Sequence, residues 1–498
     1  MKRTVCVALA LFVIAGSVAA QEIPVAVDGL FGDWETVEPA WTDPSGDGSG
    51  IDFGSVWVRS DRERVTLLLD LGSEMNLQGG NMITLLVDGD CDPSTGRAVE
   101  ETGAELTWTF GQREGEVWSA GRGTRVEQAD IGLWQAPTVS SVRFEVSFLR
   151  RTKGGVDIAP GPSVSFVLMD ESEEGGDRLP NEGAVMVELS DQPQPPPRTV
   201  SLERPRPDHI RVVTWNVLFD GLFKRPAPFI RVLGALDPDV ICFQEIWAHT
   251  ARQAADYVAL AIPGVEWHGL NTHEGHVVSR YPLLEGAAID ASGNYWALVD
   301  LPDDTFEVDL SVICAHPPCC NKEVERQEEL DGIAAWTRDT MTPGDSPIPG
   351  GAPAAFDLTE GTPVVITGDM NLVGGADQVQ TLLSGRIADE DKFGTSFEPD
   401  WDGTPLADAW PRTAGGVTVA TWRDARSSFS PGKLDYIIYS DSVLRLERAF
   451  ILATEKLPPE VLARYGLRLD DTLAASDHLP VVADFTPLAA PARTEAGE

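Results

Sequence analysis

Long apolar runs are missing from this 498-residue chain beyond its first twenty residues. No later segment approaches the ~18 uninterrupted apolar residues that a membrane helix needs, which excludes a transmembrane segment. At the start of the chain, Lys2 and Arg3 precede a short apolar stretch that ends in small residues at Ala20. This arrangement is typical of a secretory signal peptide over residues 1–20, with cleavage after Ala20. We therefore expect a secreted or periplasmic protein.

Basic residues are also scarce. The chain has 38 Lys and Arg against 78 Asp and Glu, which gives a formal net charge of −40. Such a charge argues against nonspecific adhesion to anionic polymers. It does not exclude a phosphate substrate, because a bound metal ion reverses the sign of the charge locally. The basic residues are scattered, without the aromatic-interleaved stripe that tracks a nucleic-acid backbone, and no amphipathic membrane-docking segment is evident.

Cysteine is rare as well: six occur, and Cys6 leaves with the signal peptide. The five that remain cannot all pair within one chain. Cys242 and Cys314 lie in apolar, strand-like runs, which favours a role as small buried hydrophobic side chains. Cys319 and Cys320 are adjacent in a loop, where they either join each other or act as a redox-sensitive clip. The sequence does not decide how the cysteines are connected.

The length exceeds that of one hydrophobic core, so about two domains are expected. Over residues 21–190, short apolar runs alternate with Gly, Asp and Ser clusters, and no convincing helical stretch is found. This spacing predicts an all-β domain, an antiparallel sandwich. Residues 191–208 are rich in proline and predict an extended, semi-rigid linker. The expected strands include Val65–Leu69, Ile83–Val87, Leu106–Phe110, Val142–Phe148 and Val164–Met169.

Three carboxylates alternate after the strand that ends at Val87, namely Asp88, Asp90 and Asp92. Carboxylates at this spacing in a tight loop can converge on one hard cation, and Ca²⁺ prefers such oxygen ligands. The alternative is a solvated acidic turn, although three close carboxylates repel one another unless a cation neutralises them. The loop is therefore a candidate site for structural Ca²⁺.

Several motifs of this half occur together: Asp28-Gly29, Gly32-Asp33-Trp34, the VDGDCDPSTG loop, Glu105-Leu106-Thr107-Trp108 and Phe144-Glu145-Val146. They resemble the family-nine type of carbohydrate-binding sandwich. The resemblance implies a β-sandwich and makes a glycan a candidate ligand. Tryptophan side chains would stack on sugar rings if they were exposed, and would belong to the core if they were buried. Six of the 14 tryptophans lie here: Trp34, Trp41, Trp57, Trp108, Trp118 and Trp134.

Strands alternate with helices over residues 209–487, which predicts a layered α/β domain. Ile210–Asn216 and Val240–Phe243 are apolar and strand-like, and apolar residues from Phe229 to Leu236 keep the spacing of a helix. A second helical face runs from Ala251 to Val258, and a charged helix is expected from about Lys322 to Asp339. Residues 488–498 are small and polar, and we expect a disordered tail.

Polar side chains follow four apolar strands of this half, whereas two later segments place the polar residue first. If the two later strands run antiparallel to the four earlier ones, all of these polar residues meet at one edge of the sheet. Carboxylates gathered there must be offset by a cation. The set consists of Asn216, Glu245, His316, Asp369, Asn371, Asp435, Asp477 and His478.

The same stretches carry a specific resemblance. TWNV, CFQE, VVSRYPL, CAHPP, ITGDMN, GKLDYIIY and SDHLPVVADF occur in the order and at the approximate spacing of the endonuclease/exonuclease/phosphatase superfamily. The resemblance implies a four-layer α/β sandwich of the deoxyribonuclease I-like type and a metal-dependent phosphoric ester hydrolase. The Cys319-Cys320 pair and the insertion at 342–361 depart from the simplest members, which affects the choice of substrate.

By this resemblance, Asn216, Glu245 and Asp477 form the metal-binding corner. Asp369 and Asn371 would position and activate water, His316 would hold the phosphoryl oxygens, and His478 would pair with Asp435. Oxygen ligands favour Mg²⁺ or Mn²⁺ over Zn²⁺. A histidine held by a carboxylate has a fixed tautomer and a raised affinity for its proton, which suits contact with an anionic transition state.

We therefore expect a secreted, Mg²⁺- or Mn²⁺-dependent phosphoesterase that hydrolyses phosphodiester bonds by attack of an activated water. Extracellular nucleic acid is the expected substrate, because secreted relatives of this fold often degrade it. Lipid or inositol phosphates are the alternative substrates. An alternative of another class is a catalytically silent protein that binds a surface or a glycan, although no catalytic position of the superfamily has been lost.

Overall fold

The computed structural model describes residues 26–488, apart from 100–101, 173–175, 194–200 and 343–355. The expected signal peptide lies outside the described residues, as do residues 489–498 of the expected tail. The chain divides into two units, the first formed by Met1–Pro195 with Ala425–Ser430 and the second by the remainder. None of the helices in the described part of the chain has the length and apolar character needed to cross a membrane.

Two antiparallel sheets make up most of the first unit, so the predicted all-β class is confirmed. Alternate side chains of their strands point to the same face, and Leu67, Leu69, Leu85 and Val87 from the two sheets join one buried cluster. One sheet has the order β1 (Trp41–Thr42), β2 (Ser55–Ser60), β3 (Arg64–Met75), β11 (Ser141–Leu149), β10 (Trp134–Ala136). The other has the order β13 (Arg178–Leu179), β12 (Ser163–Asp170), β4 (Ile83–Asp88), β7 (Leu106–Thr109), β8 (Glu114–Ser119), β9 (Arg122–Val126), and β14 (Val185–Glu188) also pairs with β12. A short turn η1 (Phe31–Trp34) precedes the sheets, and β5 (Arg97–Val99) pairs with β6 (Thr102–Ala104).

Five of the six tryptophans of the first unit belong to its core, pack against it or lie against arginines, and Trp118 instead donates its indole N–H to Glu116 Oε2 at 3.3 Å. Trp34 and Trp108 are both buried, each only 2% exposed. The Arg64 guanidinium lies 3.8 Å from the centre of the Trp134 ring, and the Arg143 guanidinium lies 5.6 Å from that of Trp57. These contacts support the core interpretation of the tryptophans over sugar stacking.

Two further sheets form the centre of the second unit. One has the order β17 (His268–Thr272), β18 (Gly275–Ser279), β16 (Val240–Gln244), β15 (Ile210–Asn216), β27 (Val481–Pro487), β26 (Leu444–Ile451), β24 (Arg412–Thr413). The other has the order β19 (Leu283–Ala288), β20 (Tyr295–Val299), β21 (Leu310–Ala315), β22 (Val364–Asp369), β25 (Asp435–Tyr439), β23 (Ala407–Asp408). Val212 and Val240 of the first sheet share a buried cluster with Val312 and Val365 of the second, so the two sheets pack face to face.

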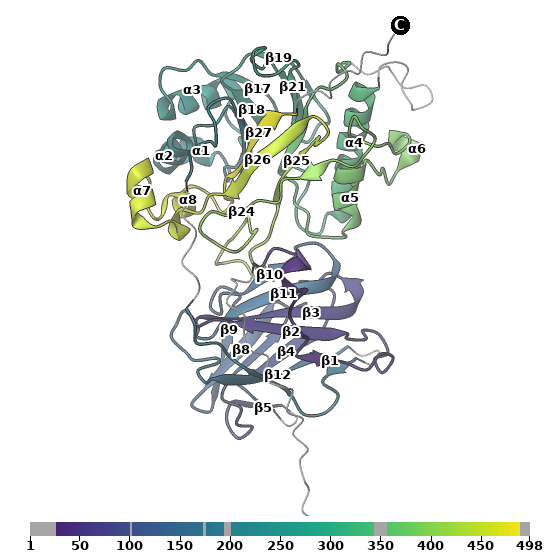
Figure 1. Cartoon of the computed structure of the whole chain (residues 1–498), viewed down its shortest axis with the longest axis vertical. Helices are drawn as coiled ribbons and strands as arrows, with labels where there is room; N and C mark the ends of the chain where they lie inside the picture. Colours follow the sequence, from purple (N-terminus) through teal and green to yellow (C-terminus); the bar gives the residue numbers. More distant parts are fainter. Residues whose placement is uncertain (1–25, 100–101, 173–175, 194–200, 343–355, 489–498) are drawn as a thin grey trace, which may run out of the picture. The chain divides into compact units, whose positions relative to one another are not determined.

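Helices cover the outer faces of this pair of sheets (Figure 1). Phe229 and Val258 from two of the helices join Val213 and Val482 in a buried cluster on one side. On the other side, the Trp336 ring lies 5.8 Å from that of Trp296 in β20. The resulting four-layer α/β fold confirms the prediction. The first group contains α1 (Gly221–Lys224), α2 (Pro226–Leu236), α3 (Ala251–Ala261), α7 (Pro459–Tyr465) and α8 (Asp471–Ala475), with the turn η2 (Thr454–Lys456) beside α8, and the second contains α4 (Glu323–Met341), α5 (Asp377–Ser384) and α6 (Glu390–Phe393).

Local sequence explains where the best predicted helices begin. Pro226 occupies the first turn of α2, where a missing N–H costs nothing. Thr250 and Gln253 form a reciprocal capping box at the start of α3. These helices, and the charged helix α4, lie where the sequence pattern predicted them.

The strand directions explain how distant polar residues are gathered. β15 is parallel to β16, and β21 is parallel to β22. β27 runs antiparallel to β15, and β25 runs antiparallel to β22, as the reversed polarity of their sequences predicted. The polar ends therefore meet at one edge, but this edge belongs to two stacked sheets and not to a single sheet, because the strands divide equally between them.

Candidate active site

Asn216 joins the two sheets at the polar edge. It is the last residue of β15, and its side-chain Nδ2 donates to Glu245 Oε1 and to Asp369 Oδ2, both at 3.0 Å. Glu245 follows β16 with a φ of 65°, a left-handed conformation that is uncommon for a residue other than glycine. Its Oε2 accepts the backbone N–H of Phe219 at 2.8 Å. Two carboxylates from different sheets are thus held on one amide.

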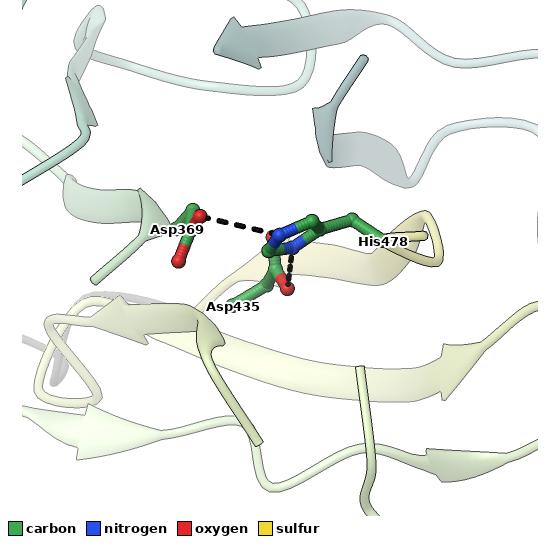
Figure 2. A group of neighbouring side chains, drawn as sticks. All are labelled: Asp369, Asp435 and His478. Atoms are coloured by element: carbon green, nitrogen blue, oxygen red, sulfur yellow. Dashed lines mark hydrogen bonds and ion pairs between the residues drawn. The ribbon is translucent and has the colours of Figure 1, made fainter. Parts of the chain in front are cut away.

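Asp369 lies beside two imidazole rings. Its Oδ2 is 3.4 Å from His478 Nε2 and 3.5 Å from His316 Nε2. The other ring nitrogen of His478, Nδ1, lies 2.9 Å from Asp435 Oδ2, and Asp435 pairs directly with Asp369 across β22 and β25. Figure 2 shows the resulting chain of side chains from Asp369 through His478 to Asp435. The predicted pairing of His478 with Asp435 is present in the structure.

Glu274 holds the second imidazole, and sequence reasoning missed it. Its Oε1 lies 2.7 Å from His316 Nδ1, and its Oε2 accepts the backbone N–H of Glu245 at 2.5 Å. The backbone N–H of His316 donates to Asn294 Oδ1 at 2.8 Å. Glu274 lies in the turn between β17 and β18, where the polar sequence Thr-His-Glu-Gly indicates only a loop. Its burial, at 1% exposure, has no signal in the sequence.

The carboxylates keep both rings positively charged at neutral pH. Burial by itself would lower the pKa of His316, but the adjacent Glu274 and Asp369 carboxylates outweigh it and raise the pKa to about 9. Burial is likewise outweighed at His478, where Asp435 and Asp369 raise the pKa to about 10. Burial raises the pKa of Asp369, and the positive His478 opposes that rise. The edge therefore presents two protonated imidazoles beside one buried carboxylate.

The other predicted site residues take different positions. Asn371 has a φ of 51°, its backbone N–H donates to Asp369 Oδ1 at 3.1 Å, and its side-chain Nδ2 donates to Pro317 O at 2.9 Å. Asn371 thus fixes the loop that carries His316. The Oδ2 atom of Asp477 accepts the indole N–H of Trp422 at 3.2 Å, and its place in the metal-binding corner stays a prediction.

The donor atoms suit a hard divalent cation. Glu245 Oε1 and Asp369 Oδ2 converge on the same amide group, and the Oδ1 atom of Asp435 is buried without a hydrogen-bond partner among the described residues. One carboxylate oxygen each from Asp369 and Asp435 lies within 4.8 Å of the other, and the protonated His478 beside them is a hydrogen-bond donor and not a ligand. Carboxylate and amide oxygens are the ligands that Mg²⁺ and Mn²⁺ prefer. These residues fit a divalent metal at the edge.

The structure shows how the cysteines of the second unit are paired. Cys319 and Cys320 are joined to each other by a disulfide, one of the two alternatives that the sequence left open. The Arg326 guanidinium donates to the carbonyl oxygens of Pro318 and Cys320 at 3.0 and 3.3 Å. Cys242 and Cys314 are free and buried, as predicted. The disulfide loop thus continues directly from His316.

In the first unit the structure changes the composition of the predicted calcium group. Asp88 and Asp90 lie together with Glu105, with one oxygen of each within 4.8 Å of the others, and Asp92 is not part of this group. Asp92 Oδ1 accepts instead from the backbone and side chain of Ser94 at 3.0 and 2.6 Å. Glu105 takes the place of Asp92 in the group because β7 pairs with β4. Leu106 lies opposite Val87 in this pairing, which puts Glu105 across from Asp88.

The sequence profile described as the Endonuclease/Exonuclease/phosphatase family matches residues 213–478. A search of curated protein sequences finds no match.

Three solved structures are among those similar to this chain. D. rerio TDP2 complexed with a single-strand DNA product has 16% identity and a TM-score of 0.35, with 56% of this chain and 99% of that chain covered. A family protein from Leptotrichia buccalis C-1013-b has 12% identity and a TM-score of 0.36, with coverage of 55% and 99%. An AP endonuclease from Archaeoglobus fulgidus has 13% identity and a TM-score of 0.35, with coverage of 55% and 98%.

All eight polar residues predicted at the sheet edge fall within the stretch that the family profile matches, residues 213–478. This stretch is more than half of the 498-residue chain. The chain therefore belongs to the Endonuclease/Exonuclease/phosphatase family and is a metal-dependent phosphoester hydrolase.

Proposed function

We propose that this hydrolase is an exported nuclease that uses Mg²⁺ or Mn²⁺ to cleave phosphodiester bonds in nucleic acid. The observation that carries the chemistry is the position of the Asp369 carboxylate between two protonated imidazoles, with distances of 3.4 and 3.5 Å. Export is proposed from the signal-like sequence of residues 1–20.

Each side chain at the edge has a distinct role in this proposal. Asp369 accepts the proton of the attacking water, and Asn371 holds Asp369 through its backbone N–H. His316 and His478 donate hydrogen bonds to the phosphoryl oxygens, where negative charge develops. Asp435 and Glu274 fix the ring orientations and keep the imidazoles protonated. A divalent metal held by Glu245 and Asn216, with Asp477 as the third ligand that the family resemblance implies, would neutralise the phosphoryl charge when bound.

Two exposed aromatic side chains favour nucleic acid as the substrate. Phe219 is 60% exposed, and its backbone N–H donates to Glu245 Oε2, so this residue lies against the metal-binding corner. Trp247 is 48% exposed, lies two residues after Glu245, and contacts the His273 ring edge-on at 5.2 Å. Exposed aromatic rings beside a phosphate site stack on nucleobases, at roughly 1–3 kcal/mol per base. Inositol phosphates have no aromatic ring to stack there.

A substrate panel tests the proposal. DNA, RNA, nucleotides, sphingomyelin, phosphoinositides and a simple aryl phosphodiester are incubated with the full chain, with Mg²⁺ or Mn²⁺ and with chelator. We expect chelator-sensitive hydrolysis of nucleic acid above the other substrates. Preference for a lipid or inositol phosphate would assign the alternative substrate class. No chelator-sensitive hydrolysis of any phosphoester would contradict the enzymatic proposal and leave the silent binding protein.

The aromatic pair has its own test. The double variant Phe219→Ala/Trp247→Ala should raise KM for single-stranded DNA at least tenfold, since about 1.4 kcal/mol of lost stacking corresponds to one factor of ten. The matched control is Leu260→Ala, which truncates a side chain of α3 that is 65% exposed. An unchanged KM in the double variant would remove the support for nucleic acid.

For the first unit we propose structural Ca²⁺ bound by Asp88, Asp90 and Glu105. The support is the buried Asp88 Oδ1, which has no hydrogen-bond partner among the described residues, beside two further carboxylates. A glycan stays the candidate partner of this unit by resemblance. Isothermal titration of the full chain with cell-wall and storage glycans would test it, and no heat of binding would contradict it.

A further inference from the structure

A second group of carboxylates lies at the edge of the first unit, away from the predicted calcium loop in the sequence. Asp43 directly follows β1, and Asp177 directly precedes β13. These are edge strands of different sheets of the sandwich. Asp47 joins them, and one oxygen from each of the three carboxylates lies within 4.8 Å of the others. Three negative charges are therefore concentrated where the two sheets end.

Asp43 is the unusual member of this group. Its side chain is 6% exposed, and both of its carboxylate oxygens are buried without a hydrogen-bond partner among the described residues. The indole N–H of Trp41 lies close enough to Asp43 to lower its pKa, but the contact falls short of a hydrogen bond, and both groups stay without a partner among the described residues. A buried carboxylate that nothing satisfies is strongly unfavourable, and such groups are normally paired or bound to a metal. Burial first, and then the charges of Asp177 and Asp47, raise the pKa of Asp43 to about 6.

The loop around the group is built to hold the other carboxylates in place. Asp177 Oδ2 accepts the backbone N–H of Phe53 at 2.6 Å, and Asp47 Oδ2 accepts from Asn181 Nδ2 at 2.5 Å. A Cβ atom at Gly48 would lie 2.0 Å from the Ile51 carbonyl oxygen and 3.1 Å from Asp177 Cβ. Only glycine lets the loop approach Asp177 this closely. The carboxylates of Asp47 and Asp177 are therefore positioned by backbone and side-chain contacts, and Asp43 faces them.

We propose that Asp43, Asp47 and Asp177 bind a divalent cation, Ca²⁺ by the chemistry of its ligands, which ties together the edges of the two sheets. All three ligands are carboxylate oxygens, and Ca²⁺ tolerates the irregular geometry of a loop better than Mg²⁺, which requires near-octahedral coordination. The cation supplies the partner that both Asp43 oxygens lack. This site is independent of the hydrolase activity and of the Asp88 group.

The rival explanation is a proton. If Asp43 were simply protonated, it would share hydrogen bonds with Asp177 and Asp47 and would need no cation. The two explanations differ in their response to an isosteric, uncharged side chain. Asp43→Asn removes a metal ligand in the first case, whereas in the second it replaces one neutral polar group by another.

The test is the number of Ca²⁺ ions bound to the full chain in equilibrium dialysis at saturating Mg²⁺. We expect Asp43→Asn and Asp177→Asn each to bind one Ca²⁺ fewer per chain than the wild type. Asp88→Asn serves as the matched control for the other acidic group, and the double variant with Asp43→Asn should lose a further ion. Equal Ca²⁺ binding by Asp43→Asn and wild type would overturn the proposal.

Thermal unfolding provides a second readout, because the difference in unfolding temperature between wild type and variant should change between Ca²⁺ and chelator. Ca²⁺ should raise the unfolding temperature of the wild type more than that of Asp43→Asn. In chelator the order should level or reverse, because the variant removes one of three repelling carboxylates. The same Ca²⁺-induced shift in both proteins, or a variant that is less stable only in chelator, would favour the proton.

Terbium provides a third readout that does not depend on stability. Tb³⁺ bound beside Trp41 should show tryptophan-sensitised emission, which Asp43→Asn should lose. Trp41→Phe should keep the full number of bound Ca²⁺ ions but lose much of this emission, because the donor ring is removed and the ligands are not. Unchanged emission in both variants would place no ion at this loop.

Discussion

The two units treat buried carboxylates in opposite ways. At the edge of the second unit, Asp369 and Asp435 face the protonated ring of His478 and Glu274 faces that of His316. In the first unit, carboxylates face one another: Asp43 with Asp47 and Asp177, and Asp88 with Asp90 and Glu105. The hydrolase site therefore contains its own positive charges, whereas the acidic groups of the sandwich would take theirs from the cations that we propose.

A metal would therefore have a different role in each unit: it would serve the chemistry of the second unit and the stability of the first. Without an ion, the carboxylates at the edge of the second unit are still partly offset by the protonated rings of His316 and His478, so we expect its fold to depend on the metal less than its chemistry does. The first unit without ions has unopposed repulsion between buried carboxylates. Chelation should thus stop hydrolysis without unfolding the second unit, and should lower the stability of the first.

The largest expected effect is on Asp369. Asp369→Asn removes the proposed proton acceptor while keeping the side-chain shape, and we expect kcat to fall by roughly 10²–10⁴-fold. Added Mg²⁺ should not restore it, because the missing function is proton transfer. Circular dichroism and the unfolding temperature serve as controls for the fold. A variant with more than a tenth of wild-type activity would show that another group accepts the proton.

Glu245→Gln should cost about 10²-fold in turnover, the typical loss of one charge-stabilising group in a preorganised site. The backbone N–H of Phe219 still has an acceptor in glutamine, so the loop should keep its shape. Unlike Asp369→Asn, this variant should recover partly at excess Mg²⁺, since its defect is weaker metal binding. Near-normal activity at limiting Mg²⁺ would mean that Glu245 is not a metal ligand.

The sequence predicts the edge of the second unit because each site residue adjoins an apolar strand. The strand fixes the position of Asn216 or Asp369, and the order of polar and apolar residues fixes the strand direction. The motifs then add the family and the four-layer fold. What the strands do not predict is Glu274, since a carboxylate in a two-stranded turn has no apolar run to show that it will be buried.

The acidic loop of the first unit also shows what a sequence pattern does not predict. Spacing in the sequence relates only neighbours, so it grouped Asp92 with Asp88. The structure groups Asp88 with Glu105, because the register of β4 against β7 brings residues 17 apart into contact. Strand register depends on the packing of whole faces and is not visible in a local pattern.

Glu274 offers a smaller but more specific effect. Glu274→Gln removes the carboxylate that holds the pKa of His316 near 9, so this pKa should fall towards its ordinary value. The protonated ring is active, and activity is lost as pH rises through the folded pKa. The wild-type profile should thus fall above about pH 9, and that of the variant at lower pH, with about tenfold lower kcat/KM at pH 8.

The pH profile distinguishes positioning from a merely structural role. The folded pKa of His316 is raised, so its contribution to stability is complete below about pH 6.5 and is lost as pH rises through about 9. Glu328→Gln is the matched control, because Glu328 is an exposed glutamate of α4 whose partner is Lys392. The control should leave the profile unchanged. A basic limb at the same pH in Glu274→Gln and wild type would contradict the role of Glu274.

The smallest expected effect distinguishes Glu105 from Asp92 in the first unit. Glu105→Gln should weaken Ca²⁺ binding about tenfold, which corresponds to roughly 1.4 kcal/mol and about 3–6 °C of the Ca²⁺-dependent rise in unfolding temperature for a unit of this size. Glutamine can still accept the backbone N–H of Gly89, so the loss should follow the charge and not the fold. Asp92→Asn removes a carboxylate charge too, but from a side chain whose Oδ1 is bound to Ser94 outside the acidic group, and it should leave the Ca²⁺ response unchanged. Differential scanning fluorimetry in Ca²⁺ and in chelator measures both variants. A larger loss for Asp92→Asn than for Glu105→Gln would mean that spacing along the loop, and not the pairing of β4 with β7, determines which carboxylates meet the ion.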